Sequence, residues 1–186
     1  FASLTGSTLK ITSPDGISTT GTVGNVQVVP ANISFDPLAT FHYIGKANQV
    51  TGNGIGSTTN GKAVIVELDT NSLQLSPSQS FGITNNTNAN INAGLGGILD
   101  IRRGRFIEST TAYITGSSGG LSMATGTYYQ IPALSSSSSD LIPRMSGLSN
   151  AYNLLGTSTI ELNGADGANP FDQYFRGQRT YRNLIF

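Results

Sequence analysis

The chain lacks cysteine and tryptophan, has a single histidine, and carries little charge. The absence of cysteine excludes a disulfide framework and any metal site built from thiolates. Charged residues make up 11% of the 186 residues, whereas an ordinary soluble domain has about 25%. The formal net charge is zero. We therefore expect no electrostatic attraction to nucleic acid or to an anionic membrane surface.

Long apolar runs are missing as well, and none approaches the ~20 residues that a membrane-spanning helix needs. Glycine, serine, threonine and asparagine instead make up 82 of the 186 residues. These small polar residues favour turns and exposed strand faces and are poor in helix interiors. Disorder is excluded because 37% of the chain is hydrophobic and these residues fall in short, scattered runs. The composition resembles that of exported microbial surface proteins.

Short stretches in which apolar and polar residues alternate recur roughly every 8–12 residues, as in an all-β sandwich or barrel. The clearest stretch follows a tight turn at Asn60-Gly61 and spans residues 63–68, where both faces are apolar at the centre. This pattern predicts a central strand. No helical pattern alternates with the strands, and no internal repeat is evident, which argues against parallel sheets and solenoids. We predict one domain over residues 1–186, an all-β, antiparallel β-sandwich of the jelly-roll type.

One segment departs from the strand pattern. Leu141, Met145, Leu148, Tyr152 and Leu155 are spaced by four and three residues in turn, which places them on one face of a helix. Gly156 would end this helix. The spacing predicts one short helix near 140–155 that packs across an open end of the sandwich.

The sequence offers little catalytic chemistry. A Ser-His-Asp triad would need His42 as its base, but this residue lies in the middle of a predicted strand, where a structural role is the simpler interpretation. No G-x-S-x-G nucleophile motif is present. Paired carboxylates could support glycoside hydrolysis, yet surface ion pairs explain them more simply. We predict no enzymatic activity and no cofactor; the carboxylate candidates are Glu67, Asp69, Asp100, Glu108 and Glu161.

Metal and anion sites are also weakly indicated. Oxygen-bearing residues gather in "ELNGADGANPFD" at 161–172, and Ca²⁺ prefers oxygen ligands. Their spacing does not match an EF-hand loop, so we predict turns and no metal site. Arg102, Arg103 and Arg105 form a basic cluster flanked by acids, which favours local ion pairing. Asn32 and Asn85 fit the N-glycosylation pattern.

The two ends of the chain are its most adhesive segments. Residues 1–13 are either an extended N-terminal arm or donor strand, anchored by apolar residues, or the first strand of the chain's own sandwich. Residues 169–186 concentrate aromatic residues and arginines, which are favoured at subunit interfaces. The same segment could instead close the protein's own sheet. The predicted subunit-contact residues are Phe1, Leu4, Leu9, Ile11, Phe175, Tyr181 and Phe186.

These features predict a non-enzymatic structural subunit of an extracellular filament, pilus or surface coat. It would assemble with copies of itself through β-strand and terminal-arm contacts, because low charge permits dense self-association. One alternative is a carbohydrate-binding or adhesive cell-surface module that contacts glycans or a host surface through Tyr113, Tyr128 and Tyr129. A viral coat or spike protein is a second alternative.

Overall fold

All paired strands run parallel to their neighbours in the part of the chain that the computed structural model describes. No helix is found among these residues, so none is long and apolar enough to cross a membrane. The described residues are 2–17, 32, 34–52, 60–61, 63–68, 82–84, 89–91, 98–108, 114–115, 120–132, 141–142, 152–163, 174–175 and 180–185.

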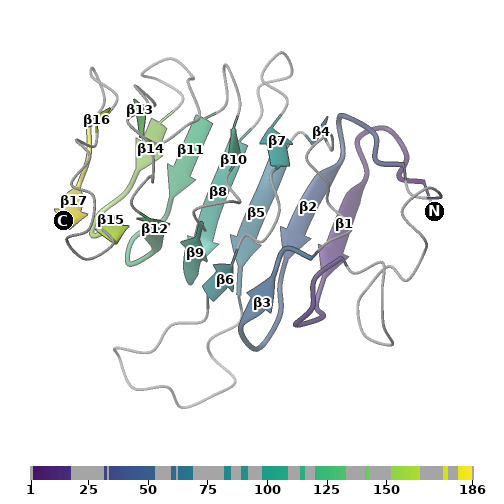
Figure 1. The fold of residues 1–186 in the computed structure, drawn as a ribbon, viewed down its shortest axis with the longest axis horizontal. Coiled ribbons are helices and arrows are strands. Elements are labelled where there is room, and N and C mark those ends of the chain that lie inside the picture. Colours follow the sequence, from purple (N-terminus) through teal and green to yellow (C-terminus); the bar gives the residue numbers. More distant parts are fainter. Residues whose placement is uncertain are drawn as a thin grey trace.

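Six strands form the first sheet, in the order β1-β2-β5-β8-β11-β14. The strand numbers increase along the long axis of the molecule, and the N-terminus lies at the opposite end from β17 (Figure 1). The strands are β1 (Thr8–Ile11), β2 (Thr40–Tyr43), β5 (Ala63–Glu67), β8 (Ile98–Arg103), β11 (Gly120–Met123) and β14 (Tyr152–Leu154). As predicted, β5 lies in the interior of its sheet.

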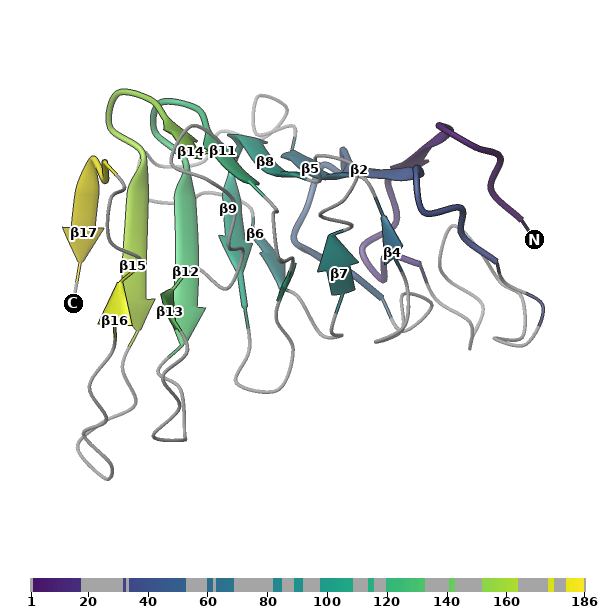
Figure 2. The same cartoon turned by 90° about the horizontal axis from the view of Figure 1, so that it is seen from above.

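The second sheet also has six strands, in the order β17-β15-β12-β9-β6-β3. Its strands β9, β12 and β15 run away from the first sheet, whose strands lie along one side of the molecule (Figure 2). The strands are β3 (Gln49–Val50), β6 (Gly82–Thr84), β9 (Arg105–Ile107), β12 (Tyr128–Pro132), β15 (Thr159–Asn163) and β17 (Asn183–Ile185).

From β2 to β16 the chain passes through the first sheet, the second sheet and a third set of strands in turn, and β17 then adds a last strand to the second sheet. Each circuit stacks on the previous one as a rung, so the architecture is a parallel β-solenoid. The third set comprises β10-β7-β4 and the pair β13-β16. Its strands are β4 (Asn60–Gly61), β7 (Ala89–Ile91), β10 (Ile114–Thr115), β13 (Leu141–Ile142) and β16 (Tyr174–Phe175).

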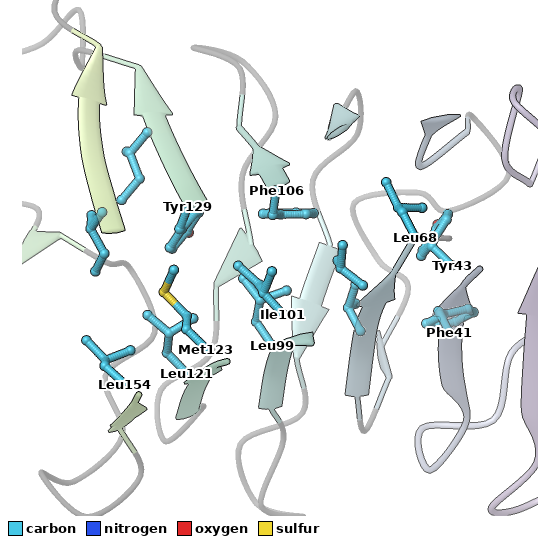
Figure 3. Packing of buried hydrophobic residues seen from close by; sticks show 14 of the residues in the cluster. Phe41, Tyr43, Leu68, Leu99, Ile101, Phe106, Leu121, Met123, Tyr129 and Leu154 are labelled. Carbon is cyan, nitrogen blue, oxygen red and sulfur yellow. The ribbon is translucent and has the colours of Figure 1, made fainter. Parts of the chain in front are cut away.

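Ladders of apolar residues fill the space between the first and second sheets. Alternate residues of a strand point to the same face, so each rung places apolar side chains directly over those of the rung before. Leu121, Met123 and Ile101 lie close to Tyr129 and Phe106 between the sheets (Figure 3). The first-sheet ladder is buried throughout and runs Ile11, Tyr43, Val66, Ile101, Met123, Leu154.

The predicted antiparallel jelly-roll sandwich is therefore wrong. Alternation with a period of two indicates a strand but says nothing about the direction of its neighbour. The solenoid repeat is hidden because the rungs differ in length. First-sheet strand starts are separated by as few as 22 residues (98 to 120) and as many as 35 (63 to 98).

The helix predicted near 140–155 is also not supported. Leu141 belongs to β13 and Tyr152 to β14, which are in different sheets, while residues 143–151 lie outside the described part. Leu154 is buried, whereas Leu155 is 46% exposed in the turn that follows. At least Leu141 and Tyr152, two of the five residues with this spacing, therefore belong to separate strands and not to one helix.

Candidate functional site

The first candidate site is a charged network on the outer face of the first sheet. Phe41 and Tyr43 are buried, so His42 between them points outward from β2. Its ring Nε2 lies 2.9 Å from Oε2 of Glu67 on the adjacent strand β5. His42, for which a structural role was predicted, is thus paired with the candidate carboxylate Glu67.

Two arginines of β8 complete the network. Arg102 donates from Nε to Oδ2 of Asp100 at 2.6 Å, and its Nη1 lies 3.6 Å from Oε2 of Glu67. Arg103 donates to Oε1 of Glu67 at 3.4 Å. Glu67 and Asp100 are therefore both paired with arginines. This is the local ion pairing that was predicted for the arginine cluster.

The electrostatics of this network favour the charged form of the Glu67 carboxylate. Partial burial tends to raise the pKa of Glu67. The hydrogen bond from His42 and the charges of His42, Arg102 and Arg103 outweigh it, and the pKa lies below its usual value. The hydrogen bond to Asp100 raises the pKa of Arg102. A general acid needs a raised carboxyl pKa, so the lowered pKa of Glu67 does not suit that role.

Two other candidate carboxylates, Glu108 and Glu161, lie on or next to strands of the second sheet, whereas the network lies on the first. Glu108 follows β9, is buried, and accepts a hydrogen bond from the Tyr129 hydroxyl at 2.8 Å. Glu161 lies half-buried on β15 of the second sheet. Asp69 falls outside the described residues. Of the candidate carboxylates, Glu67 and Asp100 share one arginine, Arg102.

The described residues give little support for a metal site or a glycan-binding site. No group of three or more His, Asp or Glu side chains that could hold a metal occurs among the described residues, and Asp166, Asn169 and Asp172 lie outside them. Tyr129 is fully buried and so is unable to stack on a sugar. Tyr128 is half-buried, and the guanidinium carbon of Arg105 lies 5.1 Å from its ring centroid.

Three residues named from the sequence remain: Asn32, Asn85 and Tyr113. Asn32 is exposed, which is compatible with its N-glycosylation pattern. Tyr113 and Asn85 lie outside the described residues.

The N-terminal end of the solenoid is the second candidate site. Residues 8–11 form β1 and pair in parallel with β2 of the same chain. Ile11 is fully buried in the core and Leu9 packs against it, whereas Leu4 is 79% exposed. Ser3 N donates to Ser34 O at 3.0 Å, so the segment before β1 is also held by its own chain. Phe1 lies outside the described residues.

The C-terminal end is built from β14, β15 and β17. Tyr181 and Leu184 are partly buried and pack against the core. Ile185 on β17 is 47% exposed, and Leu155 after β14 is 46% exposed. Phe175 belongs to β16, whose backbone pairs with β13; Phe186 lies outside the described residues.

All three exposed large hydrophobic residues of the described part lie at the two ends of the solenoid: Leu4 at one, Leu155 and Ile185 at the other. The sequence analysis proposed Leu4 as a contact but did not identify Leu155 and Ile185. Alternation in "NLIF" places Leu184 and Phe186 on one face and Ile185 on the other, which was the available signal for Ile185.

Comparison with known proteins adds no relationship. No family model matches the chain, and neither the curated proteins nor the solved structures provide a significant match.

Proposed function

We propose that this protein is a non-enzymatic structural subunit of an extracellular filament, pilus or surface coat, and that it assembles with copies of itself through the ends of its solenoid. The observation that carries the proposal is the position of the exposed apolar residues. Leu4 precedes β1, Leu155 follows β14 and Ile185 lies on β17, which are the terminal strands of the two sheets, and all three side chains are exposed. An exposed edge strand with an apolar residue such as Ile185 favours pairing with another chain.

The solenoid gives a physical reason for end-to-end contact. Each rung contacts only its neighbours, so the terminal rungs carry the surface that stacking would bury. The predicted strand donation by residues 1–13 takes a different form here. Because β1 already pairs with β2, the N-terminal end would offer a folded sheet edge in place of a free arm.

The remaining support comes from chemistry and composition. The charged network on the outer face is internally paired, and its lowered Glu67 pKa gives no indication of a general acid. The near absence of net charge weakens repulsion between copies. The extracellular location rests on the wealth of small polar residues and on the scarcity of charge.

Sedimentation velocity over a range of protein concentrations tests the proposal. Wild-type protein should form species that grow with concentration, while Leu4→Lys and Ile185→Lys should each place an unpaired charge in an end contact and shift the distribution towards smaller species. Ser122→Lys is the matched control, because it adds the same charge to the outer face of β11, an interior strand of the first sheet. A wild-type protein that remains monomeric at all concentrations overturns the proposal.

A further inference from the structure

The outer edge of β17 has backbone groups that face away from the solenoid. Asn183 N donates to Ser158 O at 3.3 Å, so Asn183 faces β15. In a parallel ladder the next residue turns its N–H and C=O to the opposite side, so those of Leu184 point away from β15. No other described strand lies beyond β17 in the second sheet.

The neighbouring edge of the first sheet is protected by a side chain. Leu155 N donates to Met123 O at 2.9 Å, so the carbonyl of Leu154, one residue earlier, faces away from β11. Arg182 donates from Nε to this carbonyl at 3.0 Å. A charged side chain that covers an edge carbonyl prevents another strand from pairing there. Among the described strands, the open edge at this end is therefore that of β17.

The opposite end of the second sheet does not offer a matching strand. Val50 N of β3 donates to Pro14 O at 2.8 Å, and Ile17 N donates to Thr51 O at 3.1 Å. The segment from Pro14 to Ile17 thus covers the outer edge of β3. Proline has no N–H to give to a further strand. A head-to-tail neighbour would meet β17 with a poor hydrogen-bonding edge.

We infer that β17 pairs with β17 of a second copy, antiparallel across a two-fold axis at Leu184. The two Leu184 residues would exchange both backbone hydrogen bonds, and Asn183 would lie opposite the partner's Ile185. The strand Asn183–Ile185 has no charged residue or proline, the usual protection of natural edge strands. Self-complementary two-fold contacts are the commonest in oligomers.

This contact rests on the proposed function, because it supplies one of the end contacts that assembly needs. It would join the second sheets of two copies into one continuous sheet and shield Ile185 from water. The N-terminal ends would then point outward, and a second contact between them would extend the dimer into a filament without polarity.

Cysteine exchange tests the geometry cleanly, since the chain has no cysteine of its own. Asn183→Cys and Ile185→Cys are made separately, mixed in equal amounts and mildly oxidised. Residues facing each other in a non-hydrogen-bonded antiparallel pair have Cα atoms about 4.5 Å apart, within the range that a disulfide spans. The mixture should give covalent dimers severalfold more efficiently than either variant alone. Asn153→Cys mixed with either variant is the control for chance collision.

Each outcome separates the pairing from the function. Equal cross-linking in the mixture, the single variants and the Asn153→Cys control overturns the two-fold pairing. If wild-type protein still forms large assemblies in that case, the proposed function stands without this contact. Selective cross-linking of the mixture, with no species larger than a dimer, supports the pairing and overturns the filament.

Discussion

Glu67 Oε2 lies 2.9 Å from His42 Nε2 across the neighbouring strands β2 and β5. The hydrogen bond with His42 and the neighbouring positive charges lower the pKa of Glu67 despite its partial burial. Arg102 and Arg103 extend the same network to β8. One carboxylate therefore ties three successive rungs together on the outer face of the first sheet.

The first prediction concerns the pH dependence of stability. A carboxyl group whose pKa is lowered by folding stabilises the fold above its ordinary pKa, about 4.3, and loses that contribution as the pH falls through the lowered value. Glu67→Gln should remove this part of the acid sensitivity and cost about 0.2–1 kcal/mol at neutral pH. Thermal unfolding between acid and neutral pH measures both effects.

Glu161→Gln is the control for that experiment, since Glu161 lies on the second sheet away from the network. If Glu67→Gln and the wild type lose stability in parallel on acidification, the network does not contribute as described.

The second prediction concerns the apolar ladder. Leu121 is fully buried, while its neighbour Ser122 points to the outer face. Leu121→Ala should lower the free energy of unfolding by about 2–5 kcal/mol. Ser122→Ala should change it by less than about 0.5 kcal/mol. Denaturant unfolding of the pair checks the assigned faces of β11, and equal losses would mean that the strand faces are misassigned.

The third prediction concerns Gln49, a buried polar residue at the corner between the first rungs. Its Nε2 donates to Ile11 O at 3.2 Å and to Ser13 O at 2.7 Å, and its Oε1 accepts from Gly45 N at 3.1 Å. Gln49→Leu would leave these groups unpaired, at about 1–3 kcal/mol for a buried group that loses its partner. Hydrogen exchange should show lost protection of the Gly45 amide.

Gln130→Leu is the matched control for this substitution, because Gln130 lies half-buried on the outer face of β12. Exchange at Gly45 that is unchanged in Gln49→Leu would contradict the role of the side chain in closing the corner.

The fourth prediction separates backbone strain from steric overlap. Gly52 and Gly126 both have positive φ, at 90° and 78°. A Cβ at Gly52 would overlap the backbone of Ile17, whereas one at Gly126 would meet no atom. Gly126→Ala should cost about 1–2 kcal/mol from strain alone. Gly52→Ala should cost clearly more and release the segment before residue 18 from β3. Chemical denaturation measures the difference, and similar losses for both variants would contradict the close approach.

The sequence predicted individual strands well but not their arrangement. Alternation of Val64, Val66 and Leu68 indicates a strand in any sheet, and β5 is indeed interior. The parallel direction was hidden because a period of two is common to both orientations. The repeat is not visible in the sequence because inward residues as different as Ile11, Tyr43 and Met123 occupy equivalent positions in different rungs.

The candidate contact residues and the charged network were predicted only in part, because local sequence does not show how strands are arranged. Leu4 was identified because it is apolar within a polar segment, and it is exposed. The pairing of His42 with Glu67 depends on the register between β2 and β5, which local sequence does not encode. Leu155 was misassigned to a helix face because its spacing from Tyr152 and Leu148 matches a helix.

Electron microscopy of the purified wild-type protein at high concentration tests the central claim most directly. The account predicts elongated particles joined end to end along the direction in which the rungs stack, with Ile185→Lys giving shorter particles. Separate, unjoined particles in the wild-type sample would contradict assembly through the solenoid ends.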